Sequence, residues 1–335
     1  MSSPAVSVVM SVFNSERYLA EAIESILNQT FTDFEFLIFD DGSTDRSPEI
    51  IREYAERDGR IAAVFSPTNR GYVVHLNEGI RRARGQYIAR MDGDDVALPR
   101  RLEVQKRLLD TEREIAVAGA STITIDENGE GEVINRRQSS PSCLYWQSFF
   151  TNPFAHPTVM YRRDAVLSAG GYDEMKMPAE DYDLWTRLLP AWQFTNIKDP
   201  LLKYRQHADS VSVRKREIQR RNSGKALAEL WKSQLGIDIS EDEVLFLKGF
   251  HKGYNDLPAH LAPSVFDKIW ALREKTRSRF AEVDDEVHRD AFRRGLYLAV
   301  RVRSVSVASF LRLSAQLVAN YPNYTTKQVL YGRFA

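Results

Sequence analysis

The sequence predicts an α/β protein: a mostly parallel sheet flanked by helices on both sides, with a helical extension at the C-terminus. First, short apolar stretches alternate with stretches of helical periodicity up to about residue 91. Second, these apolar stretches have apolar residues at consecutive positions, as strands buried on both faces do. Third, the alternation ends near residue 213, after which most of the chain has the pattern of helices with charged faces. We therefore predict two domains, residues 1–213 and residues 214–335.

Each predicted element carries a local signal. Strands are predicted where apolar residues run together, as in the Val-rich stretch AVSVVMSV, and helices where apolar residues recur every three or four positions. The predicted strands are residues 5–12, 34–39, 61–65 and 86–91, followed by 115–125, 157–162 and 194–199. The predicted helices between the first strands are residues 15–30, 47–57 and 71–85. Ser47 is the expected N-cap of the second helix, with Pro48 at its first position, and Gly85 is the expected C-cap of the third.

The composition is that of a globular protein without a strong overall charge. The chain has 335 residues, of which 46 are Lys or Arg and 46 are Asp or Glu, so no global positive field points to nucleic acid as a partner. Cys143 is the only cysteine of the sequence and can form neither an intramolecular disulfide nor a cysteine-based metal site. We expect it to be a half-buried small apolar side chain, and a reducing compartment fits this cysteine use.

The sequence predicts neither a signal peptide nor a membrane-spanning helix. The first 16 residues lack a basic region and a long apolar stretch. No stretch approaches the roughly 20 apolar residues that a spanning helix needs. We therefore expect a cytoplasmic protein, which could still lie peripherally on the inner membrane surface.

The C-terminal end of the chain is basic. From residue 293 onward there are seven basic residues and no acidic one, interspersed with apolar residues. This pattern is typical of an amphipathic helix on an anionic membrane. A helix that packs on the first domain, or on a second copy of the chain in a homodimer, fits it equally well. We thus expect residues 214–335 to contact an acceptor, a membrane surface or a dimer partner. The basic residues are Arg293, Arg294, Arg301, Arg303, Arg312, Lys327 and Arg333.

Polar residues cluster after each of the first four predicted strands. In parallel sheets, ligands bind beyond the carboxyl ends of the strands. Four such clusters at four consecutive strand ends therefore indicate one ligand site at this edge of the sheet. The clusters are residues 11–14, 40–43, 69–71 and 92–95.

The stretch MDGDD at residues 91–95 crowds three carboxylates, and three interpretations stay open at this point. Asp92 and Asp94 could present oxygen atoms to Mg²⁺ or Mn²⁺. A stretch rich in Asp and Gly is also a common turn. It loosely resembles a phosphatase loop that forms an aspartyl-phosphate, although such a loop follows the first strand and this one follows the fourth. Asp95 has no chemistry assigned to it and is expected only to shape the loop ahead of Pro99.

Three further stretches could carry chemistry. Asp41 follows a buried strand, where an ionised carboxylate can accept hydrogen bonds from N–H donors. Glu180 and Asp181 begin a predicted helix. Their charges could simply be stabilised by the helix dipole, or one of them could remove a proton from a hydroxyl group. His207 ends the mixed region, and a neutral imidazole is a common ligand for metal ions such as Mn²⁺, although a lone histidine is more often structural.

Taken together, the chain resembles the family 2 glycosyltransferases over about residues 5–212. Half a dozen motifs agree with that family in order and rough spacing. The resemblance implies a GT-A fold, with its Rossmann-like sheet, and an inverting enzyme that uses a nucleotide-sugar donor. Residues 214–335 resemble no family that we can name. The motifs are SVVMSVFNSERYLAEAIESILNQTF, FLIFDDGSTD, NRG with LNEGI, YIARMDGDD, GGYDE with AEDYDLWTRL, and YRQH.

The resemblance also implies roles for particular residues. Ser11, Asp41, Arg70 and Asp92 would bind the donor nucleotide, with Asp41 on the imide of the base and Asp92 near the ribose. Asp94 would bind the metal ion, and His207 would be a third metal contact found in some members only. Asp181 would be the catalytic base. The resemblance places two residues on the acceptor side with open roles, His156 and Glu180.

The implied reaction moves a sugar to a hydroxyl group of a glycan or lipid-linked acceptor, in bacterial cell-surface polysaccharide synthesis. Mn²⁺ or Mg²⁺ is the expected cofactor, and a UDP-sugar is the preferred donor because of the Asp41 assignment. A nucleotidyltransferase of similar fold would need a Gly-rich phosphate loop with Arg or Lys after the first strand, and SVFNSERY is not one. A dehydrogenase would need G-x-G-x-x-G there. A sugar-nucleotide-binding or scaffold protein without transferase activity is the remaining alternative.

Overall fold

The computed structural model describes residues 3–207, 215–249, 257–302 and 307–320. The chain divides into two compact units. The first comprises Met1–Leu144 and Asn152–Ser223, and the second comprises Tyr145–Thr151 and Gly224–Ala335. The division falls inside helix α9 (Arg216–Leu235), C-terminal to the boundary predicted near residue 213.

Among the described residues, nine strands form one sheet in the first unit, in the order β3-β2-β1-β4-β8-β6-β9-β5, with β7 paired to β6. The first four strands are parallel neighbours, whereas β8 is antiparallel to both β4 and β6. The mostly parallel sheet predicted from the sequence is therefore confirmed. The strands are β1 (Val6–Val12), β2 (Phe34–Asp40), β3 (Ile61–Phe65), β4 (Tyr87–Asp92), β5 (Val96–Ala97), β6 (Ile115–Ile125), β7 (Val133–Asn135), β8 (Met160–Arg162) and β9 (Gln193–Arg205).

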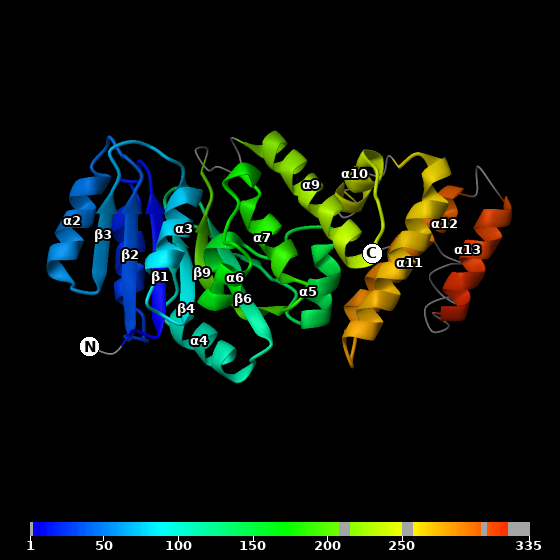
Figure 1. Cartoon of the computed structure of the whole chain (residues 1–335), viewed down its shortest axis with the longest axis horizontal. Coiled ribbons are helices and arrows are strands. Elements are labelled where there is room, and N and C mark those ends of the chain that lie inside the picture. The colour runs from blue at the N-terminus through cyan, green and yellow to red at the C-terminus, as the bar shows by residue number, and fades with distance from the viewer. Residues whose placement is uncertain (1–2, 208–214, 250–256, 303–306, 321–335) are drawn as a thin grey trace. The chain divides into compact units, whose positions relative to one another are not determined.

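Helices follow the strands of the first unit and make up the second (Figure 1). Before the unit division they are α1 (Leu19–Leu27), α2 (Ser47–Arg57), α3 (Tyr72–Arg82), α4 (Arg101–Thr111), α5 (Pro141–Ser148), α6 (Arg163–Ser168) and α7 (Glu180–Leu188), with the 3-10 turns η1 (His156–Thr158) and η2 (Glu174–Lys176). After α9 come α10 (Glu241–Gly249), η4 (Ala259–Leu261), α11 (Ala262–Arg279), α12 (Asp285–Val302) and α13 (Val307–Asn320).

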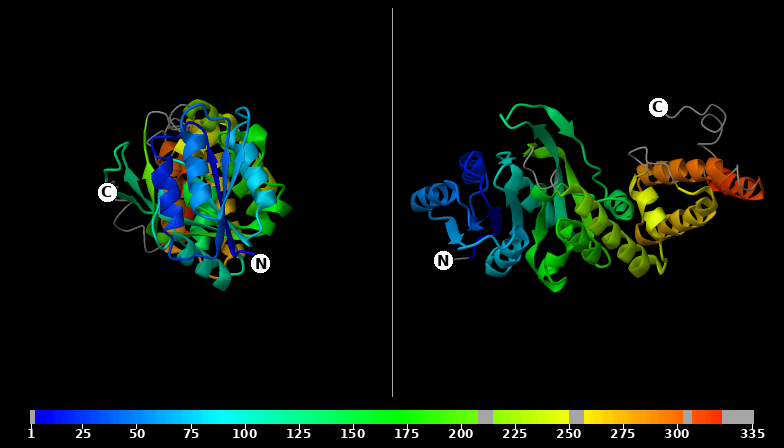
Figure 2. Two further views of the ribbon diagram at one scale, coloured as in Figure 1. Left: turned by 90° about the vertical axis from the view of Figure 1, so that its left-hand side faces the viewer. Right: turned by 90° about the horizontal axis from the view of Figure 1, so that it is seen from above.

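The sheet of the first unit is covered on both faces, as the left view of Figure 2 shows for the blue strands. One face carries an apolar cluster, in which Val8 and Met10 of β1 are buried together with Ile23 of α1. The other face packs on α3 at close range, since a Cβ atom on Gly79 would lie only 2.5 Å from a methyl carbon of Val9. Successive strand residues point to opposite faces, so apolar residues at consecutive positions were the right signal for a sheet buried on both sides.

Two predicted helix caps are wrong, and the structure shows why. Helix α2 begins at Ser47 itself, and the Asp45 carboxylate accepts the hydrogen bond from the Ser47 N–H group. The Ser47 hydroxyl instead accepts a hydrogen bond from the N–H of Ser15 at 2.9 Å. Helix α3 ends before Gly85, whose N–H donates to the Ser7 hydroxyl. A Cβ atom on Gly85 would lie 2.6 Å from the Ser7 nitrogen, so this glycine allows the chain to pass close to β1.

The strand predicted at residues 157–162 is only half a strand. Residues His156–Thr158 form the turn η1, and the strand β8 begins at Met160. The Thr158 hydroxyl donates to the carbonyl of Ala155 and accepts from the N–H of Ala120. This hydroxyl stabilises the turn, and its effect is invisible in the apolar pattern that predicted a strand.

In the second unit, α11, α12 and α13 pack in sequence order (Figure 1). Its core includes a buried charge: Arg294 donates to Asp290 at 2.8 Å and lies over the ring of Phe150 at 3.7 Å. Trp146 donates to the same aspartate at 2.7 Å, which explains why the short segment around it belongs to this unit.

Arg294 is fully buried and therefore cannot be part of the predicted basic C-terminal surface. Arg303, Lys327 and Arg333 lie outside the described residues. Among the described residues, no helix combines the length and the apolar character needed to cross a membrane. Cys143 is buried, at 3% exposure.

Candidate active site

The strand register brings the polar clusters after β1, β2 and β4 to one edge of the sheet. Ser11 lies opposite Phe39 of β2 on one side and opposite Asp92 of β4 on the other. The loops that follow these strands therefore start at the same level. Ser11, a predicted donor contact, lies in β1 between the strands that carry the two acidic motifs.

The loops after β1 and β2 are joined by hydrogen bonds between side chains and backbone. The Asn14 amide oxygen accepts the N–H of Thr44 at 2.8 Å, and Asp45 accepts the N–H of Glu16 at 2.9 Å. Asn14 has a positive φ of 49°, a conformation that Asn tolerates better than most residues. Ser43, Thr44 and Asp45 thus join the loop after β2 to the loop after β1.

Asp41 is buried and holds the start of helix α3. Its Oδ1 accepts hydrogen bonds from the backbone N–H of Arg70 at 2.6 Å and from His75 Nε2 at 2.8 Å. Its Oδ2 accepts from the N–H of Gly71 at 2.9 Å. Arg70 thus meets Asp41 through its backbone, while its side chain is exposed. A carboxylate can only accept, so His75 carries its proton on Nε2.

The loop after β4 places three carboxylates together. One oxygen of each of Asp92, Asp94 and Asp95 lies within 4.8 Å of the other two. Arg90 Nη1 donates to Asp92 Oδ2. Burial raises the pKa of Asp92 although Arg90 opposes it, and burial and then repulsion from Asp94 and Asp92 raise the pKa of Asp95 well above its usual value.

Arg205 joins this loop to the end of β9. Its backbone N–H donates to Asp95 Oδ1 at 2.8 Å, and its Nε donates to the Asp94 carbonyl at 2.8 Å. Its Nη2 reaches Glu21 at 2.6 Å. These contacts place His207, two residues further on, with Nε2 at 3.0 Å from Asp94 Oδ2. The structure therefore brings together the two residues predicted to bind metal.

The residues of this loop fit a divalent cation. Asp95 is 1% exposed, and its Oδ2 has no hydrogen-bond partner among the described residues. Three clustered carboxylates of this kind supply the oxygen ligands that Mg²⁺ and Mn²⁺ take. Asp95, for which the sequence predicted only a role in loop shape, therefore belongs to the candidate metal site by its geometry.

A second acidic site lies at the start of helix α7. Asp181 accepts hydrogen bonds from the Asn152 amide at 2.6 Å and from the N–H of Tyr182 at 2.7 Å. Glu180 accepts from the Tyr72 hydroxyl at 2.9 Å. His156 Nδ1 lies 3.8 Å from the same Glu180 oxygen. Asp181, Glu180 and His156, which the sequence assigned to the base and the acceptor side, are thus grouped in space.

Burial dominates the electrostatics of this second site. Burial, with repulsion from Asp181, raises the pKa of Glu180 to about 8. Burial also raises the pKa of Asp181, while the hydrogen bonds from Tyr182 and Asn152 oppose it. The pKa of His156 is lowered well below its usual value by burial and then by the charge of Arg90. At neutral pH, therefore, Glu180 is mostly protonated and His156 is neutral.

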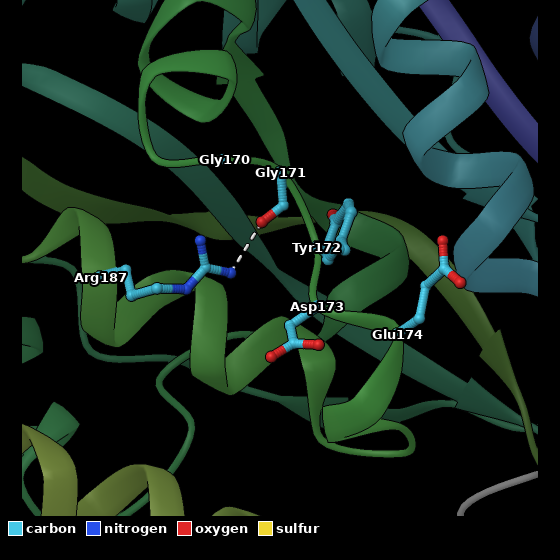
Figure 3. Close-up of a pocket in the computed structure, with 6 residues that line it drawn as sticks. All are labelled: Gly170, Gly171, Tyr172, Asp173, Glu174 and Arg187. Carbon is cyan, nitrogen blue, oxygen red and sulfur yellow. Dashed lines mark hydrogen bonds between the residues drawn. The ribbon is translucent and has the colours of Figure 1, made fainter.

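A hollow of about 450 Å³ lies next to this second site. Tyr172 lines the hollow, and its hydroxyl lies 2.9 Å from Nε2 of His156. Arg187 closes one side of the hollow by donating to the Gly171 carbonyl at 2.7 Å (Figure 3). Asn77 of the LNEGI motif fixes Tyr172 through hydrogen bonds of 2.9 Å to its N–H and carbonyl. The clustered carboxylates do not line this hollow. Its lining residues are Gly170, Gly171, Tyr172, Asp173, Glu174 and Arg187.

Besides Arg205, sequence reasoning missed four residues that hold the site together: Tyr72, His75, Arg90 and Asn152. One of them had a signal, since Arg90 is a charged residue within the apolar strand YIARM. The other three had none, because their partners are distant in sequence. His75 and Asp41, for example, are 34 positions apart.

The sequence is similar to proteins with named functions. A family model described as Glycosyl transferase family 2 matches residues 7–168. The putative glycosyltransferase EpsE of Bacillus subtilis is 37% identical over 218 residues, which are 64% of this chain and 77% of EpsE. The O-antigen biosynthesis glycosyltransferase WbnJ of Escherichia coli is 34% identical over 210 residues, which are 62% of this chain and 81% of WbnJ.

The fold is similar to solved glycosyltransferase structures. S. aureus TarS 1–349 in complex with UDP-GlcNAc has a TM-score of 0.58 at 17% identity, covering 98% of this chain and 93% of that one. The mannosyltransferase PcManGT from Pyrobaculum calidifontis, in complex with GDP-Man and Mn²⁺, has a TM-score of 0.53 at 15% identity, covering 96% and 88%. At these identities the likeness concerns the fold alone, and it confirms the predicted GT-A fold.

The matches to the family model, to EpsE and to WbnJ decide the family. They exclude the dehydrogenase, phosphatase and nucleotidyltransferase alternatives, and they confirm the prediction of an enzyme. The chain belongs to glycosyltransferase family 2.

Proposed function

We propose that this glycosyltransferase moves a sugar, with inversion, from a nucleoside diphosphate sugar to a hydroxyl group of a glycan or lipid-linked acceptor in cell-surface polysaccharide synthesis. One observation carries the proposal. A loop with three clustered carboxylates and a separate buried carboxylate at the start of α7 lie in the same unit. The name of WbnJ, which refers to O-antigen biosynthesis, supports the polysaccharide pathway.

The first acidic site would hold Mn²⁺ or Mg²⁺ through Asp92, Asp94 and Asp95, with His207 beside Asp94. A bound divalent cation stabilises the negative charge that develops on a diphosphate leaving group. Arg205 fixes both the loop and His207, so it orients this set of side chains. The Mn²⁺ in the PcManGT complex supports the choice of ion.

The donor nucleotide would lie along Ser11, Asp41, Arg70 and Asp92. A carboxylate accepts about four hydrogen bonds, and Asp41 already accepts three from protein groups. The position left on Oδ2 suits the single imide N–H of uracil better than the adjacent N–H donors of guanine. This supports a UDP-sugar as donor, as does the UDP-GlcNAc bound to TarS.

Asp181 would remove the proton from the acceptor hydroxyl as that oxygen attacks the sugar. A raised pKa makes Asp181 a better proton acceptor than an exposed aspartate. Glu180 is unsuited to this role because its pKa of about 8 keeps it protonated at neutral pH. An inverting displacement needs one base and no carboxylate nucleophile. Glu180 and His156 would instead hold the acceptor side.

Residues 214–335 would serve the acceptor, a membrane surface or a second copy of the chain. Helix α13 supports a surface contact, because Leu311 is 60% exposed and Val318 is 51% exposed. For a lipid-linked acceptor the expected location is the cytoplasmic face of the inner membrane. Sedimentation with anionic vesicles at low salt tests this location, and a protein that stays in the supernatant would contradict it.

Release of a nucleoside diphosphate from a panel of nucleotide sugars tests the reaction. We expect release with Mn²⁺ or Mg²⁺, loss of release in EDTA and recovery when the metal is added back. Asp181→Asn should reduce turnover by about a thousandfold or more while donor binding stays nearly unchanged.

Asp183→Asn is the matched control, since Asp183 lies on the same helix but pairs with Arg187 at 2.9 Å. Its activity per folded molecule should stay close to wild type. An active Asp181→Asn enzyme would contradict the assignment of the base. A wild-type protein that binds donors without releasing the diphosphate would instead favour the binding-protein alternative.

A further inference from the structure

His75 is a buried polar side chain in the first turn of helix α3. It is fully buried, and its ring stacks on the ring of Phe39 in β2, with 5.7 Å between the ring centroids. Its Nδ1 atom has no hydrogen-bond partner among the described residues. Burying a polar atom without a partner costs free energy, and an apolar ring would fill this space without that cost. The choice of an imidazole is therefore explained by its other nitrogen atom.

The other nitrogen atom of His75 binds Asp41. Nε2 lies 2.8 Å from Asp41 Oδ1, and the Ser66 hydroxyl lies further away, at 3.5 Å from the same nitrogen. Both Asp41 oxygens also accept backbone N–H groups, those of Arg70 and Gly71. The carboxylate thus acts as an acceptor throughout, which puts the proton of His75 on Nε2 and leaves Nδ1 with a lone pair.

The three hydrogen bonds divide unequally between the two oxygens of Asp41. Oδ1 accepts from Arg70 at 2.6 Å and from His75, whereas Oδ2 accepts from Gly71 at 2.9 Å. A carboxylate oxygen accepts about two hydrogen bonds, so His75 takes the second position of Oδ1 and one position stays open on Oδ2. The Asp41 side chain is only 2% exposed, so little of it is left for a ligand to contact.

His75 also fixes the plane of the Asp41 carboxylate. Arg70 and Gly71 are adjacent in the chain and precede α3, whereas His75 lies within the helix. A third donor from a different place opposes rotation of the carboxylate about its Cβ–Cγ bond. The loop after β2 has little room to adjust, because a Cβ atom on Gly42 would lie 2.6 Å from the carbonyl carbon of Thr68. The open position on Oδ2 therefore has a fixed direction before a ligand binds, which favours binding.

We propose that His75 is a positioning residue that sets the choice of donor base through Asp41. This inference rests on the proposed role of Asp41 as the contact to the base. Uracil presents one imide N–H, which a single acceptor position satisfies. Guanine presents two adjacent donors, its ring N–H and its exocyclic amino group, which pair best with both oxygens of a carboxylate. Because His75 fills Oδ1, one guanine donor would be left without a partner, and binding would be weaker.

The first test needs no nucleotide. The nitrogen NMR chemical shifts of the His75 ring report which nitrogen atom carries the proton. We expect a proton on Nε2 and a lone pair on Nδ1. His75→Gln, which lacks these signals, identifies them among the six histidines of the chain. A proton on Nδ1 alone would overturn the proposal, because Nε2 would then have none to donate to Asp41.

The second test measures the binding of UDP and GDP by calorimetry in the presence of Mn²⁺. We expect wild type to prefer UDP. His75→Phe keeps a ring but removes the donor, so the ratio of the GDP Kd to the UDP Kd should fall by about tenfold. Pyrophosphate, which has no base, should bind His75→Phe and wild type alike. An unchanged ratio, or equal weakening of all three ligands, would show a merely structural histidine and overturn the proposal.

Two further variants serve as controls for His75→Phe. The Gln side chain of His75→Gln carries an amide N–H group that can reach Oδ1, so most of the preference for UDP should remain. Leu76→Ala changes the next residue of α3, which is buried. It should lower stability and leave the ratio as in wild type. If His75→Gln lost the preference as fully as His75→Phe, the hydrogen bond to Oδ1 would not be its cause and the proposal would fail.

Asp41→Ala separates this inference from the proposed donor site. It should abolish the preference for UDP. If it does so while His75→Phe keeps the preference, the inference about His75 fails alone. If wild type binds neither nucleotide, prefers GDP, or has a preference that Asp41→Ala retains, the proposed contact between Asp41 and uracil fails and the inference fails with it.

Discussion

The loop after β4 and the start of α7 both carry adjacent carboxylates, yet their surroundings differ. In the loop, the Asp92 and Asp94 side chains are 32% and 30% exposed and have cationic or imidazole neighbours, Arg90 and His207. At α7, Glu180 and Asp181 are 2% and 8% exposed and accept from neutral donors, Tyr72 and Asn152.

This difference separates two kinds of chemistry. Partly exposed carboxylates that share one small volume can take up a cation from solution. A buried carboxylate with neutral partners has a raised proton affinity and suits proton transfer. The same residue types are thus suited to different chemistry, because one pair lies at an open strand end and the other lies in the interior at a helix start.

The largest effect that we expect in this comparison is a loss of Mn²⁺ binding, which should occur when the loop after β4 is changed but not when α7 is changed. Asp94→Asn should weaken Mn²⁺ binding, measured by calorimetry with Mn²⁺ alone, and lower turnover by at least about a hundredfold. Asp181→Asn should leave Mn²⁺ binding intact. His207→Ala should have a smaller effect than Asp94→Asn. Unchanged Mn²⁺ binding in Asp94→Asn would erase the distinction between the two sites.

The next effect concerns pH and stability. Glu180 has a usual pKa of 4.5 and a pKa of about 8 in the folded chain, so the folded state holds its proton more tightly. The free energy of unfolding should therefore fall as the pH rises from about 4.5 to about 8. In Glu180→Gln this fall should be smaller by on the order of 3 kcal/mol, as measured by urea unfolding across that range.

Glu56→Gln, a change of an exposed residue on α2, is the control for Glu180→Gln. It should leave the pH dependence of unfolding as it is in wild type. An identical pH dependence in Glu180→Gln and wild type would show that the interior site is less dehydrated than its burial indicates, and the comparison with the loop would weaken.

The smallest expected effect comes from removing one neutral hydrogen-bond donor of the second site, the hydroxyl of Tyr72. Tyr72→Phe removes the hydroxyl that donates to Glu180 at 2.9 Å. We expect a loss of about 1 kcal/mol in the free energy of unfolding, and a further rise in the pKa of Glu180 because this hydrogen bond lowers it. Tyr87→Phe is the control, since Tyr87 donates at 2.8 Å to the more exposed Asp110 and should matter less. Equal losses in both variants would contradict the special role of burial at α7.

Much of the fold could be predicted because its signals are local. The apolar runs located β1 to β4 within a residue or two, and the acidic stretches were correctly placed after β2 and β4. Where prediction failed, a side chain had a distant partner. Ser47 caps nothing on α2 because its hydroxyl binds Ser15, 32 positions away. The basic C-terminal pattern likewise concealed Arg294, whose partner Phe150 comes from much earlier in the chain.

The sequence alone determined the alternation of strands and helices, the edge of the sheet that carries the acidic loops and the family of the enzyme, because periodicity and motif order are properties of neighbouring residues. Only the tertiary structure decided which carboxylates face cations and which face neutral donors. Asp94 meets the imidazole of His207 across 113 positions, and Glu180 meets the neutral hydroxyl of Tyr72 across 108. Proton affinity depends on burial and on charges within a few ångströms, and these distances exist only once such remote segments have packed together.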